Sequence, residues 1–278
     1  MLKDGGFPHL FLVGNVIVYG YKGVLYMSVF SIFFSPTKST KKIVKMVSKE
    51  FGDSQTIDLC DRNGNFNYSF SSEDVCIVGV PSYGGRVPSI ALERMDSFSG
   101  NGAKAILAVA YGNRDYDDTL KELEEFLNSK GFCCVGAMAV IAEHSIMHQF
   151  ASGRPNAEDE RELEDFAKQI HEKMESTTLF ERLELPGKFP YKKYNGVPLK
   201  PKATDDCTQC GLCASVCPVG AISLSDPKKT DKNVCISCMR CIDVCPEHAR
   251  KLNSLLLMTA SKGLESVCKV RKENELFL

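Results

Sequence analysis

The chain has 278 residues, enough for one or two domains, and 44% of them are hydrophobic. Lysine and arginine total 34 against 35 aspartates and glutamates, so the net charge is −1. This balance excludes the basic surface by which proteins bind nucleic acid and any general attraction to anionic membranes. The 13 cysteines indicate metal ligands in a reducing compartment, the cytoplasm, rather than a disulfide framework.

Residues 1–26 are a leader of doubtful structure. From Leu10 to Phe34 the only charge is Lys22, a pattern that resembles a membrane span. However, the apolar part that precedes the first expected strand ends near Tyr21, and it is shorter than the roughly 20 residues that cross a bilayer. We therefore expect no membrane span. A signal peptide is the alternative, although a small-residue cleavage site is missing.

Residues 27–185 predict an α/β domain with a doubly wound, five-stranded parallel sheet, because apolar strand-like runs alternate with amphipathic helices. The expected strands are 28–34, 55–60, 75–80, 105–110 and 132–142, and a last helix is expected at 157–175. Ligands of such sheets bind at the carboxyl ends of the strands. Unusual loops follow four of the strands, at 35–40, 81–88, 111–116 and 143–148. We expect these loops to converge on one crevice.

The first of these loops, residues 35–40, has the sequence S-P-T-K-S-T and leads directly into a helix. Hydroxyl groups and free backbone N–H groups at the start of a helix form a binding site for anions. An ordinary helix cap is the alternative, since serine and threonine are common caps. Four hydroxyls in six residues exceed the needs of a cap, so the loop predicts a phosphate site.

The domain resembles flavodoxin, whose first loop has the pattern Ser/Thr-x-Thr-Gly-x-Thr and binds the phosphate of FMN, and whose later loops enclose the flavin ring. The resemblance implies FMN as a cofactor. It assigns to FMN the residues Ser35, Thr37, Lys38, Ser39, Thr40, Tyr83, Gly84, Gly85, Tyr111, Gly112, Asn113 and Tyr116. Lys38 departs from the pattern, which has glycine at this position. If the backbone there needs a positive φ, lysine costs energy; alternatively, its ammonium helps to neutralise the phosphate.

Two histidines, His144 and His148, follow the fifth expected strand. A structural or solvated histidine is the ordinary interpretation. Because histidine titrates near neutral pH, His144 beside a flavin would also suit proton transfer.

Residues 186–203 form a linker that is rich in proline and lysine, and it should be extended and fairly stiff. Residues 204–248 then contain C-T-Q-C-G-L-C-A-S-V-C-P and, after a spacer, C-I-S-C-M-R-C-I-D-V-C-P. Each copy has three cysteines at Cys-x-x-Cys spacing, a fourth three residues further on, and then a proline. A stiff tether would hold this second domain near the crevice.

The repeated cysteine pattern resembles the bacterial two-cluster ferredoxin run, which implies a small α+β domain with two 4Fe-4S clusters. In that run the fourth cysteine of each copy binds the other cluster. One cluster would take Cys207, Cys210, Cys213 and Cys245, and the other Cys235, Cys238, Cys241 and Cys217. A pair of zinc sites is the alternative, but zinc sites usually have two separated Cys-x-x-Cys pairs.

Residues 249–278 predict a helical tail that packs on one of the domains or, alternatively, binds a partner. Together the two halves resemble the EFR-type ferredoxins, a family of flavodoxin–ferredoxin fusions found in anaerobes. The motifs that match are P-S-Y-G-G-R-V-P, Y-G-N-R-D-Y-D-D, the E-H-S stretch and the terminal E-L-F-L. The resemblance covers about residues 28–278 and implies electron transfer with redox partner proteins.

Three functions fit the sequence. The first is an electron carrier that passes electrons between two 4Fe-4S clusters and a bound FMN, since clusters move single electrons and a flavin takes one or two. The second is an oxidoreductase that reduces a small molecule at the flavin, fed by its own clusters. The third is a flavin-free docking domain fused to a ferredoxin, which only the departure at Lys38 supports. The sequence assigns no catalytic residue, and it does not indicate the oligomeric state.

Overall fold

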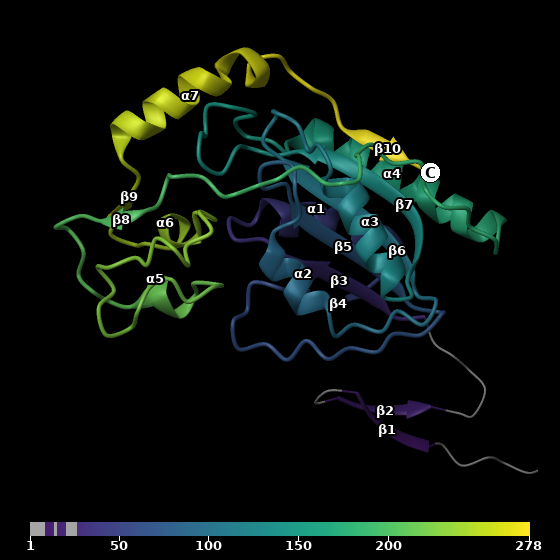
Figure 1. Ribbon diagram of the computed structural model, residues 1–278. Coiled ribbons are helices and arrows are strands. Elements are labelled where there is room, and N and C mark those ends of the chain that lie inside the picture. The colour runs from purple at the N-terminus through teal and green to yellow at the C-terminus, as the bar shows by residue number, and fades with distance from the viewer. Residues whose placement is uncertain (1–8, 14–15, 21–26) are drawn as a thin grey trace, which may run out of the picture.

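The computed structural model describes residues 9–13, 16–20 and 27–278, and its centre is a sheet with helices on both faces (Figure 1). Five parallel strands lie in the spatial order β4-β3-β5-β6-β7. Their bounds are β3 (Val29–Phe33), β4 (Ser54–Asp58), β5 (Val75–Pro81), β6 (Lys104–Tyr111) and β7 (Cys133–Ile141). Counted within the domain, this order is 2-1-3-4-5, the flavodoxin-like arrangement. The predicted five-stranded parallel sheet is confirmed.

Helices cover both faces of the sheet because the strands are apolar on both sides, as expected of buried parallel strands. The helices are α1 (Ser39–Ser48), the short η1 (Lys49–Phe51), α2 (Ser89–Met95), α3 (Thr119–Ser129) and α4 (Ala157–Ser176). Helices α1 and α4 pack on one face, where Phe33 contributes to the core. Helices α2 and α3 pack on the other face, where Ile32 and Phe34 point.

The end of the chain differs from the expected helical tail. Helix α7 (Ser254–Cys268) is followed by a short strand, β10 (Glu275–Phe277), which pairs antiparallel with β7 and extends the sheet at that edge. Leu276 lies opposite Met138 in this pairing. The terminal E-L-F-L therefore belongs to the α/β domain, although more than 130 residues separate the two strands in sequence.

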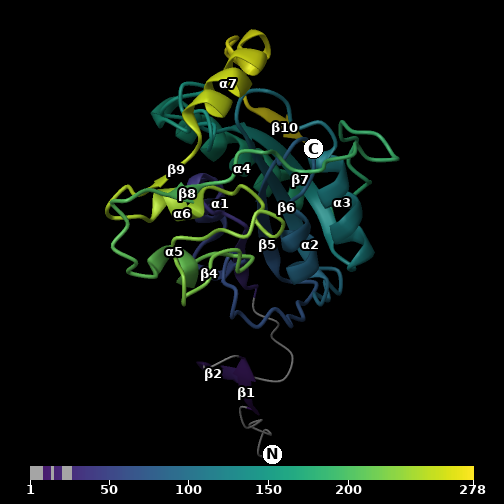
Figure 2. The same cartoon turned by 60° about the vertical axis from the view of Figure 1, so that its left-hand side comes forward.

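The cysteine-rich domain lies beside the carboxyl ends of the parallel strands (Figures 1 and 2). It consists mostly of loops, with the paired strands β8 (Lys202–Ala203) and β9 (Arg250–Lys251) and the single-turn helices α5 (Leu212–Ser215) and α6 (Arg240–Asp243). Each of these helices begins inside a Cys-x-x-Cys-x-x-Cys run, after a residue with positive φ, Gly211 in one copy and Met239 in the other. The two copies of the motif thus repeat one local structure.

Within the leader, an antiparallel hairpin consists of β1 (His9–Val13) and β2 (Val16–Gly20). The rest of the leader prediction, on residues 1–8, 14–15 and 21–26, lies outside the described residues. Among the residues that the structure describes, no helix has both the length and the apolar character that a bilayer crossing requires.

Candidate functional site

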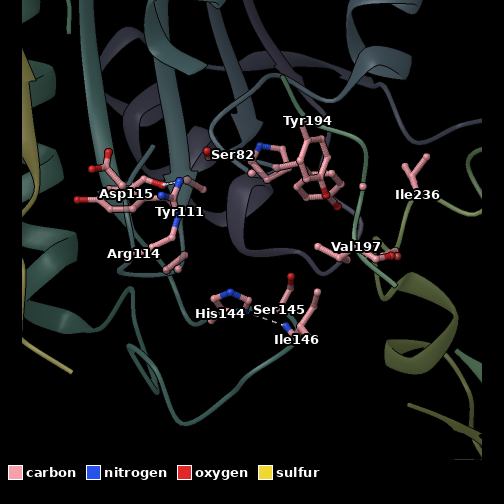
Figure 3. Close-up of a pocket in the computed structure, with 18 of the residues that line it drawn as sticks. Ser82, Tyr111, Arg114, Asp115, His144, Ser145, Ile146, Tyr194, Val197 and Ile236 are labelled. Atoms are coloured by element: carbon pink, nitrogen blue, oxygen red, sulfur yellow. Dashed lines mark hydrogen bonds between the residues drawn. The ribbon is translucent and has the colours of Figure 1, made fainter. Parts of the chain in front are cut away.

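The four loops after β3, β5, β6 and β7 converge on one cavity of about 520 Å³, as the strand-end argument predicted (Figure 3). Tyr111 and Arg114 lie on one side of this cavity, and Tyr194 and Ile236 lie on the other. We call it the crevice. Of the residues assigned to FMN from the sequence, those that line the crevice are Thr37, Ser39, Thr40, Tyr83, Gly84, Tyr111 and Gly112.

The loop before α1 offers hydroxyl groups to the crevice, but not all of its hydroxyls point there. The buried Ser35 hydroxyl accepts a hydrogen bond from the backbone N–H of Lys41 at 2.9 Å, so this serine satisfies one of the free N–H groups in the first turn of α1, whose N-cap is Lys38. The N–H of Ser35 points instead to the sulfur of Cys60, at 3.2 Å. Thr37, Ser39 and Thr40 remain at the crevice wall beside the positive end of the α1 dipole, which favours an anion there.

Lys38 adopts the left-handed backbone conformation, with φ 70°, that its position in the flavodoxin pattern reserves for glycine. This conformation costs a residue with a side chain about 1–2 kcal/mol. The Lys38 ammonium pairs with Asp243 of α6 at 2.8 Å and is not among the groups that line the crevice. Its side chain is 72% exposed, so the ion pair stabilises little.

Three residues assigned to the flavin ring lie elsewhere. Asn113 is buried and donates hydrogen bonds to the backbone carbonyls of Cys268, at 2.7 Å, and Val270, at 2.8 Å. The Tyr116 hydroxyl donates to Glu275 of β10 at 3.1 Å. Asn113 and Tyr116 thus hold the end of the chain against the α/β domain. Gly85 (φ 87°) packs against Asp117, which fills the space of a β-carbon.

Two glycines of the crevice wall are required by close approach. A β-carbon on Gly84 (φ 61°) would lie 2.2 Å from the ring of Tyr194, which belongs to the linker. A β-carbon on Gly112 would lie 2.6–2.7 Å from the imidazole of His144. These two glycines therefore allow His144, from a loop that was expected at the crevice, and Tyr194, from the linker, to approach the crevice wall.

The sequence-based prediction missed the part of the crevice wall that comes from beyond the α/β domain. These residues are Lys192–Val197 of the linker, Ile236 and Ser237 between two cysteines of the second run, and Leu264 of α7. The proline content of the linker indicated an extended chain but not the surface along which it runs. No local sequence pattern predicts that these residues reach the crevice, because their position depends on how the two domains pack together.

His144 is held in one tautomer. Its Nδ1 accepts hydrogen bonds from the backbone N–H groups of Ile146 and Met147, both at 3.2 Å, so the hydrogen of the neutral ring is on Nε2. Burial lowers the pKa of His144 to about 4 from its ordinary value of 6.5. The imidazole is therefore neutral at physiological pH, where it can donate a hydrogen bond from Nε2 but cannot supply a proton as an imidazolium.

The eight cysteines of the repeated motif divide into the two predicted sets. One small cavity is lined by Cys207, Cys210, Cys213 and Cys245. A second is lined by Cys217, Cys235, Cys238 and Cys241. The fourth cysteine of each copy thus crosses to the other cavity. Each set of four lines a small cavity. In the part of the chain that the structure describes, no group of three or more potential ligands is placed to hold one metal ion.

The donor chemistry of both cavities fits an iron–sulfur cluster. In each cavity the crossing cysteine also accepts a backbone hydrogen bond, from Ala221 to Cys217 and from Ala249 to Cys245, both at 3.3 Å. Each cavity is further lined by an arginine, Arg250 in the first and Arg240 in the second, whose buried Nε has no partner among the described residues. Hydrogen bonds and positive charge near thiolates and sulfides stabilise an anionic cluster.

The second cavity lies next to the crevice. Ile236 and Ser237, between Cys235 and Cys238, line the crevice. Burial raises the pKa of the Tyr83 phenol well above its ordinary value, and negative charge on Cys238 acts in the same direction, so this crevice tyrosine lies close to the second set of cysteines.

A buried arginine fastens this docking. Arg94 of α2 donates to the carbonyl oxygen of Leu59 and, at 2.7 Å, to that of Pro218, the residue after Cys217. It therefore joins the α/β domain to the backbone that carries a ligand of the second cavity.

Comparison with known proteins identifies the cysteine-rich segment. Residues 206–250 match the family model of the 4Fe-4S dicluster domain. No curated protein matches the chain. The protein is therefore a flavodoxin-like α/β domain, defined by its strand order, joined to a 4Fe-4S dicluster domain.

Several solved structures resemble about half of the chain. Flavodoxin 1 from Bacillus cereus is 18% identical over 53% of this chain and 98% of its own, with a TM-score of 0.39. Flavodoxin from Fusobacterium nucleatum, bound to flavin mononucleotide, is 17% identical over 53% of this chain and 97% of its own, with a TM-score of 0.37. Rubredoxin oxygen:oxidoreductase from Desulfovibrio gigas is 16% identical over 54% of this chain and only 36% of its own, with a TM-score of 0.39.

Proposed function

We propose that this protein is a cytoplasmic iron–sulfur flavoprotein that transfers electrons between redox partner proteins and a bound FMN through its two 4Fe-4S clusters. The observation that carries the proposal is the shared wall of the crevice. Ile236 and Ser237, which stand between two cluster ligands, also line the cavity at the carboxyl ends of the strands. The sequence motifs P-S-Y-G-G-R-V-P, Y-G-N-R-D-Y-D-D, E-H-S and E-L-F-L support the further proposal that the protein belongs to the EFR-type family.

The crevice fits FMN in size and in chemistry. Its volume of about 520 Å³ lies within the range of roughly 300–1,000 Å³ that small-molecule and cofactor sites occupy. Thr37, Ser39 and Thr40 at the start of α1 would hold the phosphate. Tyr83 and Tyr111 would line the ring. When bound, FMN and the clusters supply the redox chemistry, one electron at a time from a cluster and one or two from the flavin.

The residues of the chain would position these groups and exclude water. Tyr194 of the linker packs on Gly84 and closes the crevice from the side of the second domain. Leu264 of α7 adds an apolar contact at the rim. His144 keeps its hydrogen on Nε2 across the physiological pH range, so it would donate one fixed hydrogen bond into the crevice.

The two cluster sites would have different roles. The second loop, residues 235–241, is docked against the crevice, and Ser237, Cys238 and Met239 are buried. In the first loop, residues 207–213, Cys210 is exposed. Electrons would therefore enter or leave at the first loop, where a partner protein can approach, and the second cluster would connect that loop to the flavin.

Anaerobic purification of the full chain tests the proposal. We expect a brown protein whose iron and sulfide counts correspond to two clusters, and one FMN per chain released on denaturation. The matched variant Thr37→Val should keep the iron and lose FMN affinity, because it removes a hydroxyl from the crevice wall. A protein with two clusters and no flavin would overturn the FMN part and favour a docking domain, and zinc in place of iron would overturn the redox assignment.

One observation favours the alternative of a flavin-dependent reductase. A second hollow of about 470 Å³ shares Tyr111 and Asp115 with the crevice and is lined by Tyr116, Lys272 and several acidic residues. A small substrate could occupy it beside the flavin. Steady-state reduction of a panel of quinones, nitroaromatics and nicotinamides distinguishes the two functions. Failure across the panel, with normal exchange with a ferredoxin, would leave the electron carrier.

A further inference from the structure

The two cluster cavities share a feature that the cysteine motif does not contain. Among the described residues, the buried side-chain nitrogen and oxygen atoms that lack a hydrogen-bond partner are the Nε atoms of Arg240 and Arg250. Arg250 lines the first cluster cavity, and Arg240 lines the second. An unpartnered buried donor costs free energy, so its occurrence once at each cavity calls for a partner inside the cavity.

Arg250 is the more deeply buried of the two, with 2% of its surface exposed. Its guanidinium donates to the hydroxyl of Thr230, at 2.6 Å, and to the carbonyl oxygen of Pro227. Both partners are uncharged, so neither offsets the positive charge of the arginine. Burying a cation without a counter-charge is costly. The groups at hand that would become negative when they ligate iron are the cysteines of the first cavity, which Arg250 lines, and Cys241 of the second set, on which its charge also acts.

We propose that Arg250 and Arg240 are the counter-charges of the two clusters, each donating its free Nε–H into its own cavity and raising the reduction potential of the cluster held there. Reduction of a 4Fe-4S cluster adds one electron and no bond, and so increases the negative charge of an already anionic group. A nearby buried cation stabilises the reduced state more than the oxidised one. Net charge and hydrogen bonds to the sulfurs are the terms by which a protein sets cluster potentials.

The two arginines should differ in strength. Arg250 is almost completely shielded from solvent, whereas Arg240 is only partly buried. A charge that water does not screen acts more strongly at the same distance. Arg250 should therefore raise the reduction potential of its cluster more than Arg240 raises that of the other cluster. This inference rests on the two clusters of the proposed function but not on the flavin, so a protein with clusters and no FMN would still test it.

A purely structural role is the competing explanation for Arg250, since it ties together the backbone at Pro227 and the side chain of Thr230. Two variants separate the roles. Arg250→Gln removes the charge, whereas Thr230→Val removes one hydrogen bond and keeps the charge. Lys251→Gln is the matched control, because it removes a positive charge from the neighbouring but exposed position.

The experiment is an anaerobic redox titration of the full-length protein with both clusters bound, followed by electron paramagnetic resonance, with iron counted for each variant. At a fixed potential near the wild-type midpoint, Arg250→Gln should lower the ratio of reduced to oxidised cluster about tenfold, a downward shift of about 59 mV for a one-electron couple. Arg240→Gln should lower it at the other cluster about threefold. Arg250→Lys, Thr230→Val and Lys251→Gln should stay close to the wild type.

Wild-type midpoints in a fully loaded Arg250→Gln, or an equal shift in Lys251→Gln, would overturn the proposal. If Arg250→Gln does not retain its iron, Arg240→Gln decides, because Arg240 is less buried and its replacement disturbs less. A lowered potential in that variant supports the proposal, and an unchanged or raised potential rejects it.

Discussion

The two copies of the cysteine motif have the same spacing and the same local fold but different surroundings. In the first copy, Cys210 and Leu212 are exposed to solvent. In the second copy, the corresponding positions are Cys238, which is buried and close to Tyr83 of the α/β domain, and Arg240, which is only partly exposed and close to Cys60. The spacing of the cysteines therefore determines which cluster each motif can bind, whereas the rest of the chain determines how exposed that cluster site is. Under the proposed function, the exposed copy is the one that a partner protein would approach, and the buried copy is the one that would serve the crevice.

The strongest test of this comparison removes one cluster at a time. We expect Cys210→Ser and Cys238→Ser each to lose about half of the iron, because each cluster needs four thiolates. After photoreduction of the flavin, Cys210→Ser should still exchange electrons between the flavin and its remaining cluster, and Cys238→Ser should not. Time-resolved visible spectra of the two variants measure this exchange. The opposite pattern would reverse the roles of the two loops.

The crevice, against which the buried copy is docked, also predicts a pH dependence through His144, which lines it. Because the pKa of His144 is lowered to about 4, the unfolded chain binds more protons than the folded chain between pH 4 and the ordinary value of 6.5. Stability from this residue is therefore complete above pH 6.5, is lost as the pH falls toward 4, and amounts to at most about 3 kcal/mol.

Urea unfolding at pH 7.0 and 5.5 measures this effect. His144→Gln should weaken the decrease in stability between the two values. His148→Gln, at the exposed histidine nearby, should retain it. A wild-type protein that is equally stable at both values would contradict the prediction.

Arg94 offers a way to loosen only the docked copy. Arg94→Met removes the hydrogen bonds to Leu59 and Pro218 and leaves two buried carbonyl oxygens unpaired, so we expect a loss of about 2 kcal/mol. Hydrogen exchange should increase in residues 235–241 and remain unchanged in residues 207–213. Arg62→Gln, at an exposed arginine near the same domain boundary, is the control. Equal exchange in both loops would show that Arg94 does not hold the docked copy in place.

The smallest expected effect concerns Lys38. Lys38→Gly should stabilise the protein by about 1 kcal/mol, because relief of the left-handed conformation outweighs the loss of an exposed ion pair with Asp243. Asp243→Asn removes the same pair and keeps the strained lysine, so it should be neutral or slightly destabilising. Thermal unfolding compares the two. A destabilised Lys38→Gly would mean that the ion pair contributes more to docking than its exposure indicates.

The sequence was sufficient for the features that depend on local spacing. Apolar runs at 75–80 and 105–110 predicted buried parallel strands, and the repeated cysteine pattern predicted which thiols share a cavity. The positive φ that could make Lys38 costly was also anticipated from the loop pattern alone. The strands and the backbone of the Lys38 loop are determined by a few neighbouring residues, whereas the crossing of the fourth cysteine follows from the resemblance to the two-cluster ferredoxin run.

The features that the sequence did not reveal depend on contacts between distant segments. Strand β10 has only three residues, and it forms because the edge of β7 is available to it. Asn113 and Tyr116, assigned to a flavin by their place in a loop, instead bind the returning end of the chain. Tyr194 reaches the crevice only because the linker crosses Gly84. In each case a residue's partner lies 110 or more positions away, beyond the reach of any periodicity.

The pairing of β10 with β7 changes how the cluster domain is attached. The polypeptide leaves the α/β domain along the linker and returns to its sheet after α7, so the cluster domain is anchored at both of its ends like an inserted module. A module on a single tether samples a wide volume, whereas two anchors restrict it and raise the effective concentration of one surface at the other. The docked cysteine loop is thereby confined to the neighbourhood of the crevice.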